Sequence, residues 1–234
     1  MADSPEDKSF AADQPGLSEY VLKTFSPEDA LLSDVRKRAK DAGLPPIHVS
    51  RYDGRILEVI ARAANAKKIV EIGTLAGFSG LCLARALPEG DPHAVLHTFE
   101  FEPKHAAVAA ETFRLGGVSH KVKIHIGPAA DNLPSIQHEG PFDLVFIDAD
   151  KEGYPHYLKW AAANLRVGGT VLVDNAFAWG LTTKSENDPE LADPKQRAAW
   201  RAITSVNATL ADPAGPFRSA MLPTGEGLAM GVKK

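Results

Sequence analysis

Acidic residues follow two apolar segments that are predicted to be strands. Asp148 follows residues 145–147, and Asp174 and Asn175 follow residues 171–173. Because neighbouring parallel strands end at the same edge of a sheet, the two carboxylates should lie close together, which is unfavourable unless a cation or proton joins them. Carboxylate and amide oxygens suit Mg²⁺, Ca²⁺ or Mn²⁺. Asp148, Asp174 and Asn175 are therefore candidate metal ligands; the alternative is that they cap helices and form surface ion pairs.

A glycine-containing turn between a predicted strand and a predicted helix is a second candidate site. Residues 70–80 have the sequence VEIGTLAGFSG, with glycines spaced G-x3-G-x2-G. Glycine lets a ligand approach the backbone, and the start of the following helix offers free N–H groups. The spacing differs from the G-x-G-x-x-G dinucleotide fingerprint, which disfavours a nicotinamide oxidoreductase. The alternative is a tight turn that binds no ligand.

Glu100 stands at the end of the next predicted strand. In nucleotide-binding α/β folds, an acid at this place accepts hydrogen bonds from ribose hydroxyls. The alternative is an ordinary solvated acid, since Glu102 stands close by. Other catalytic patterns are missing: the eight histidines show no zinc-ligand spacing, and there is no G-x-S-x-G motif. Cys82, the single cysteine, is predicted to pack in the core.

These residues would be positioned by regularly alternating elements. Apolar strands are predicted at 69–73, 95–101, 122–126, 142–148 and 170–174, and helices at 79–87, 103–115, 129–137 and 154–165. This alternation predicts an α/β fold with a mostly parallel sheet covered by helices on both faces. A long helix at 196–210 precedes two strands at 218–222 and 228–232, whose short link predicts an antiparallel hairpin at the sheet edge. Residues 181–195 are expected to form a long polar loop.

The N-terminal part of the chain has a different character. Residues 1–17 are polar and expected to be flexible. Ser26, followed by Pro27, is predicted to cap a helix that ends near Gly43, and a second helix is predicted at 52–64. We therefore expect one domain over 18–234, with N-terminal helices at 18–66 and the alternating core at 67–234.

Composition narrows the class of protein. The 234 residues carry a net charge of −4, which gives no general basic field for nucleic acid. One cysteine excludes an intrachain disulfide and fits a reducing compartment. The acidic start does not have the pattern of a signal peptide, and no apolar run is long enough to cross a membrane. A cytoplasmic protein without a membrane partner is the expectation.

Several of these motifs together resemble those of the cation-dependent O-methyltransferases, which include caffeoyl-CoA and catechol O-methyltransferases. The motifs are EIGT at 71–74 with GFS at 77–79, GPA at 127–129, FDLVFIDADK at 142–151, DN at 174–175 and LPTGEGL at 222–228. The resemblance spans about residues 26–234. It implies a Rossmann-like methyltransferase fold with a seven-stranded sheet that binds S-adenosylmethionine and a divalent cation, Mg²⁺ above all.

The resemblance also implies a role for each matching residue. The implied metal ligands are Asp148, Asp174 and Asn175. The implied cofactor contacts are Val49, Glu71, Gly73, Thr74, Ser79, Glu100, Ala129 and Asp150. Lys151 matches the lysine that serves the family as general base, and the alternative is that it only pairs with Asp150 on the surface. Family members commonly form homodimers, so we expect one here.

Two stretches depart from the family pattern. Residues 50–54 are SRYDG where the family often has Ser-Pro-Glu-x-Gly, near the methionine end of the cofactor. Residues 176–180 are AFAWG where the plant enzymes have an asparagine that contacts substrate. This second departure disfavours caffeoyl-CoA as the acceptor.

A cation that holds two adjacent substrate oxygens would favour a small aromatic vicinal diol, such as a catechol, phenylpropanoid or flavonoid, because a single hydroxyl cannot chelate. Two alternatives stay open at this point. The first is a methyltransferase that modifies tRNA, which the acidic balance disfavours. The second is a non-catalytic protein that binds S-adenosylmethionine, which the metal-ligand set and Lys151 disfavour.

Overall fold

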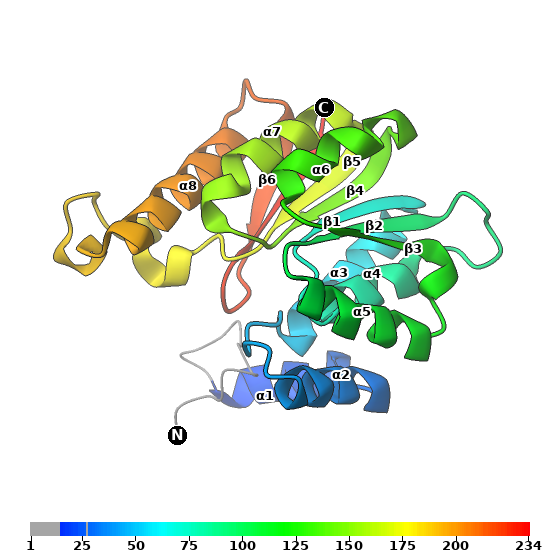
Figure 1. Ribbon diagram of the computed structural model, residues 1–234. Coiled ribbons are helices and arrows are strands. Elements are labelled where there is room, and N and C mark those ends of the chain that lie inside the picture. Colours follow the sequence, from blue (N-terminus) through cyan, green and yellow to red (C-terminus); the bar gives the residue numbers. More distant parts are fainter. Residues whose placement is uncertain (1–14, 27) are drawn as a thin grey trace.

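The computed structural model describes residues 15–26 and 28–234 (Figure 1). The helices are α1 (Pro15–Phe25), α2 (Ala30–Asp41), α3 (Arg51–Ala63), α4 (Phe78–Ala86), α5 (Pro103–Leu115), α6 (Ala129–Ile136), α7 (Tyr154–Asn164) and α8 (Pro194–Ala211). The strands are β1 (Lys68–Ile72), β2 (Val95–Glu100), β3 (Val122–Ile126), β4 (Phe142–Ile147), β5 (Leu165–Val173), β6 (Phe217–Leu222) and β7 (Leu228–Lys233).

All seven strands form one sheet in the order β3-β2-β1-β4-β5-β7-β6. Strands β1 to β5 pair in parallel, whereas β7 runs antiparallel to both β5 and β6. The predicted fold, with its edge hairpin, is confirmed. The chain leaves β1 toward β2 and β3 and then returns to the other side of β1 as β4. Open α/β sheets bind ligands at the carboxyl ends of the strands beside such a switch.

The sheet is buried on both faces, with α3, α4 and α5 on one side and α6, α7 and α8 on the other (Figure 1). Successive side chains of a strand point to opposite faces. The core on the α3–α5 side receives Leu144, Phe146 and Leu172, and the core on the α6–α8 side receives Val145, Ile147 and Val171. Cys82 lies in the first core and is buried, as predicted.

The N-terminal elements differ from the expectation in two places. Pro15–Leu17, expected to be flexible, belong to α1, and residues 1–14 lie outside the described residues. The N-cap of α2 is Asp29 rather than Ser26, because Asp29 Oδ1 accepts a hydrogen bond from Leu32 N at 2.9 Å. Pro27 lies outside the described residues. The polar segment 181–195, expected to be a loop, includes the end of one 3₁₀ turn and a second turn at Pro189–Leu191, and its last two residues already belong to α8.

A buried histidine on β2 should make the protein sensitive to acid. The His97 side chain is fully buried, with Nδ1 3.0 Å from His125 Nε2 and Nε2 3.3 Å from Glu139 Oε2. Lys123 donates to the same Glu139 oxygen at 2.9 Å. Burial lowers the pKa of His97 to about 4, against the opposing effect of Glu139. His97 is therefore neutral in the fold at pH 6, whereas an unfolded chain binds a proton there.

Because the folded-state pKa is depressed, stability should fall as the pH drops from about 6.5 toward 4, at about 1.4 kcal/mol for each unit of pKa difference. His97→Gln should flatten this part of the stability curve, measured as urea midpoints at pH 7.0, 5.5 and 4.5. The matched control is His93→Gln at an exposed position, which should keep the wild-type slope. Parallel curves for wild type and His97→Gln would show that His97 does not set the acid response.

Candidate active site

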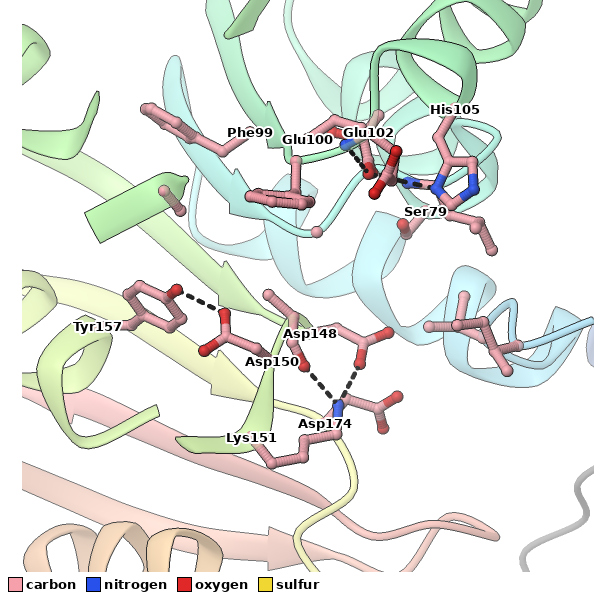
Figure 2. Close-up of a pocket in the computed structure, with 18 of the residues that line it drawn as sticks. Ser79, Phe99, Glu100, Glu102, His105, Asp148, Asp150, Lys151, Tyr157 and Asp174 are labelled. Atoms are coloured by element: carbon pink, nitrogen blue, oxygen red, sulfur yellow. Dashed lines mark hydrogen bonds and ion pairs between the residues drawn. The ribbon is translucent and has the colours of Figure 1, made fainter. Parts of the chain in front are cut away.

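A cavity of about 790 Å³ opens at the carboxyl ends of the parallel strands. Eleven of the twelve residues predicted from the sequence line it: Val49, Gly73, Thr74, Ser79, Glu100, Ala129, Asp148, Asp150, Lys151, Asp174 and Asn175. Glu100, His105 and Ser79 lie on one side, whereas Lys151, Asp148 and Asp174 lie together on the other (Figure 2). Most of the candidate residues therefore lie in one cavity, as expected for residues at the carboxyl ends of parallel strands.

Gly73 lets the ends of two strands meet beneath the cavity. It has φ +104°, and a Cβ atom there would lie 1.9 Å from the carbonyl oxygen of Asp148. Asp148 N donates to Ile72 O at 2.8 Å, so the ladder between β1 and β4 continues to the residue that enters the site. Only glycine permits both this conformation and this close approach. The backbone around Asp148 is therefore fixed by the strand next to it.

Glu71 is the predicted residue that does not line the cavity. It is fully buried and accepts hydrogen bonds from Ser79 Oγ and Thr98 Oγ1, both at 2.6 Å. Thr98 also lies 2.5 Å from the hydroxyl of Thr74. Burial raises the pKa of Glu71 to about 8, although both hydroxyls oppose the shift. Glu71 thus supports Ser79 and Thr74 from behind, and Thr98, a polar residue inside an apolar strand, is a member of this network that the sequence analysis missed.

Glu100 fixes the glycine turn as well as lining the cavity. Its Oε2 accepts a hydrogen bond from Leu75 N at 2.7 Å, and its Oε1 accepts one from Glu102 N at 3.0 Å. His105 Nδ1, which was not predicted, lies 3.3 Å from Oε1 (Figure 2). Glu100 is 7% exposed, so it is a held carboxylate and not the freely solvated acid of the alternative interpretation.

Asp174 is a buried carboxylate that the protein itself satisfies only in part. It is 4% exposed, and its Oδ1 has no hydrogen-bond partner among the described residues. Burial raises the pKa of Asp174 well above its usual range, and the charges of Asp148 and Asp53 raise it further. An unpaired buried charge is strongly unfavourable. A cation at this point would relieve both the burial and the repulsion.

The donor chemistry around Asp174 fits a hard divalent cation. Asn175, in a left-handed conformation with φ 57°, is 6% exposed and lines the same cavity. Among the described residues no three His, Cys, Asp or Glu side chains converge on one point. A cation here would therefore rely on two carboxylates, one amide and oxygens from outside the chain, which is the pattern that Mg²⁺ favours.

Lys151 lies on the side of the cavity that carries Asp148 and Asp174 (Figure 2), and its Nζ atom has three neighbours. It donates to Asp148 Oδ1 at 3.0 Å, to Ala149 O at 3.0 Å and to Tyr154 OH at 2.6 Å. Its ion-pair partner is therefore Asp148, and not Asp150 as the surface-pair interpretation supposed. Asp150 instead accepts hydrogen bonds from Gly153 N at 2.9 Å and Tyr157 OH at 2.6 Å (Figure 2).

The link between β6 and β7 holds the segment that carries Asn175. Ala176 N donates to Gly227 O at 2.8 Å, and Phe177 N donates to Glu226 O at 3.0 Å. Gly227 has φ +75°, and a Cβ atom there would lie 2.6 Å from the ring of Phe177. The glycine is therefore required both by its backbone conformation and by the aromatic ring that packs on it.

Comparison with known proteins decides which family shares this arrangement. The family described as O-methyltransferase matches residues 23–234. The chain belongs to the O-methyltransferase family. The catechol O-methyltransferase of Niastella koreensis is 37% identical over 195 residues, covering 82% of this chain and 87% of the relative. The catechol O-methyltransferase of Mycobacterium tuberculosis is 38% identical over 176 residues, covering 75% and 78%.

A solved O-methyltransferase has the same fold. The O-methyltransferase TomG of Streptomyces achromogenes, involved in tomaymycin synthesis and solved in complex with SAM, superposes with a TM-score of 0.81. It is 32% identical, and the match covers 94% of this chain and 96% of that one. The family predicted from the motifs is confirmed. In the part of the chain that the structure describes, no helix is both long and apolar enough to span a membrane.

In the present chain a second cavity, of about 730 Å³, adjoins the first. Asp150, Lys151 and Trp179 line both cavities. The second is otherwise bounded by Glu152 and by Asp193, Lys195, Gln196 and Ala199, at the beginning of α8. Trp179 is 48% exposed and has the left-handed φ of 56°. A ligand near Lys151 could therefore extend past an aromatic wall that the sequence analysis did not assign to the site.

Proposed function

We propose that this O-methyltransferase transfers the methyl group of S-adenosylmethionine to one oxygen of a small aromatic vicinal diol, with a divalent cation bound by Asp148, Asp174 and Asn175. The observation that carries the proposal is the buried Oδ1 atom of Asp174, which has no partner among the described residues, at the wall of a cavity that also holds Lys151. Burial and the neighbouring carboxylates disfavour the ionised form of Asp174, and a bound divalent cation would offset both effects.

The larger part of the cavity suits the cofactor. Glu100 presents a held carboxylate for ribose hydroxyls, and Ala129 lies at the start of α6, on the adenine side in the family. Thr74 and the segment 47–49 also line the cavity, and we assign the methionine end of the cofactor to them. When bound, S-adenosylmethionine supplies a methyl group on a positively charged sulfur. Ser79 and Thr74, held by Glu71 and Thr98, keep this wall rigid.

The metal end of the site explains the choice of acceptor. Asp148, Asp174 and Asn175 would hold Mg²⁺, or Mn²⁺ or Ca²⁺ in its place. When bound, the cation lowers the pKa of a hydroxyl that it contacts. Lys151 lies beside Asp148, and its neutral amine form would take the proton of that hydroxyl. Two adjacent oxygens on one ring can reach the cation together, and the rest of the acceptor would lie along Trp179 in the second cavity.

The proposal is tested by a methyl-transfer assay with catechol, caffeate, a flavonoid diol and bulk tRNA. The purified protein, S-adenosylmethionine and Mg²⁺ or Mn²⁺ should give methylated diols. The reaction should stop with EDTA and resume when the metal is added in excess. Resorcinol, whose hydroxyls are not adjacent, is the matched negative control. Full activity in excess chelator would eliminate the metal from the proposal, and methylation of tRNA alone would favour the RNA-modifying alternative.

A further inference from the structure

Arg36 on α2 joins three separate segments of the chain. Its Nε atom donates to Glu28 Oε1 at 2.9 Å, and its Nη2 atom donates to the carbonyl oxygen of Val49 at 3.2 Å. Its guanidinium group also lies over the ring of Phe78, 4.3 Å from the centroid. The side chains of Arg36 and Glu28 are only 11% and 18% exposed. This arrangement is therefore screened from solvent much better than an ordinary surface ion pair.

Two of the three segments form one wall of the first cavity. Ile47, His48 and Val49 line it, and so does Phe78 at the beginning of α4. Arg36 itself does not line it. The His48 ring lies 6.3 Å from the Phe78 ring, so the two aromatic groups of this wall are neighbours. Arg36 can act on a bound ligand only through the wall.

The segment 45–49 makes few backbone hydrogen bonds. Ile47 N donates to Pro45 O at 2.9 Å within it, and the buried Val49 side chain packs in the core. The segment is irregular, and Pro45 and Pro46 carry no backbone N–H group. The contact from Arg36 to Val49 O therefore ties this segment to α2 just before the N-cap residue Ser50 begins α3. A wall that is ordered before the ligand arrives lowers the entropic cost of binding that ligand.

We propose that Arg36 is a positioning residue that holds residues 47–49 and Phe78 in place as the binding wall for the methionine end of the cofactor. The inference rests on the proposed function, because it assumes that S-adenosylmethionine occupies this cavity. Glu28 balances the charge of Arg36, so the effect comes from shape. Only a planar guanidinium can meet a carboxylate with one edge, a carbonyl with another and an aromatic ring with its face. Lysine has the charge and cannot make the three contacts together.

The test compares Arg36→Lys and Arg36→Met with Arg38→Lys. Arg38 lies on the same helix, pairs with Asp34 at 2.7 Å and does not line the cavity, so it is a matched control. Titration calorimetry with S-adenosylmethionine and S-adenosylhomocysteine should show Kd raised at least about tenfold in both Arg36 variants. KM for S-adenosylmethionine should rise in parallel, and kcat should fall by a smaller factor. Arg38→Lys should match wild type.

Each result decides between two possibilities. A wild-type Kd in Arg36→Lys and Arg36→Met would overturn the role of Arg36, and recovery by lysine alone would show that charge acts instead of shape. If a melting curve shows that Arg36→Met is unfolded, Glu28→Ala removes the carboxylate that anchors an intact Arg36 and should raise Kd by about two- to threefold; an unchanged Kd would overturn the proposal. A wild-type protein that binds neither ligand would instead overturn the proposed function itself.

Discussion

Replacing Asp174 with asparagine should lower kcat at least about 100-fold while changing the affinity for S-adenosylmethionine by less than about threefold, since a metal ion contributes several kcal/mol of transition-state stabilisation. The variant keeps the volume of the side chain and removes the charge that a cation would bind. The assigned cofactor contacts lie mainly on the β1 and β2 side of the cavity. Stopped assays for turnover and calorimetry for binding separate the two effects.

The same substitution should change the stability of the metal-free protein in a direction that depends on pH. The pKa of Asp174 is raised in the fold, so its carboxyl holds a proton that the unfolded chain releases above about pH 4. Wild-type stability in EDTA should therefore decrease as the pH rises above about 4, as far as the raised folded-state pKa. Asp174→Asn does not titrate and should be the more stable protein at pH 7 in EDTA.

Thermal unfolding with and without Mg²⁺ measures this directly. Wild type should gain stability from the metal, whereas Asp174→Asn should show no gain, because only binding to the folded state shifts the midpoint. Asp150→Asn is the control: its carboxylate is already satisfied by Gly153 N and Tyr157 OH, and the metal response should persist. Equal metal-induced shifts in wild type and Asp174→Asn would remove Asp174 from the metal site.

Lys151→Ala should lower kcat at pH 7 by at least about tenfold, because a general base typically contributes about 10²–10⁴-fold. The loss should shrink at higher pH, as the acceptor hydroxyl ionises unaided. Affinity for S-adenosylmethionine should hardly change. The observation behind this prediction is the position of the Lys151 Nζ atom, held between Asp148 Oδ1 and Tyr154 OH at the junction of the two cavities.

Lys151→Arg distinguishes a base from an ion-pair partner. Arginine keeps the positive charge beside Asp148 and is effectively always protonated. A catalytic base would thus be lost as completely in Lys151→Arg as in Lys151→Ala, whereas a residue that only neutralises Asp148 would be largely replaced. Wild-type kcat in the arginine variant, across pH 6.5 to 9, would assign the proton removal to solvent.

The sequence pattern predicted most of the sheet, because buried parallel strands are continuous apolar runs bounded by glycine or capping residues. It located β3 and α5 at their observed bounds and shortened β5, which was expected to begin at residue 170. The cause is Gly168 and Gly169, where the pairing of β4 with β5 also shifts register. Helix α1 was not predicted as a separate helix: residues 15–17 were assigned to the flexible start, and the first predicted helix began at Ser26. Its Tyr20 and Phe25 stay largely exposed.

The site could be predicted where chemistry stands at strand ends and could not where it depends on packing between distant segments. Asp148 and Asp174 follow apolar runs, so the common edge of a parallel sheet brings them together. Tyr154 is fully buried and Trp179 is partly exposed, and neither carries a local pattern that points to a cavity. Arg36 reaches Val49 and Phe78 because α2 lies next to the segment before α3 and to the first residue of α4.

The insertion of β7 between β5 and β6 has a consequence for synthesis of the chain. Until residues 217–233 have left the ribosome, β5 presents an open edge, and the segment after Asp174 lacks the backbone partners that Glu226 and Gly227 provide. An unpaired, largely apolar edge strand is prone to wrong pairing with other chains. The nascent protein thus completes its sheet and its proposed metal-binding corner together, and premature termination within this hairpin would leave both incomplete.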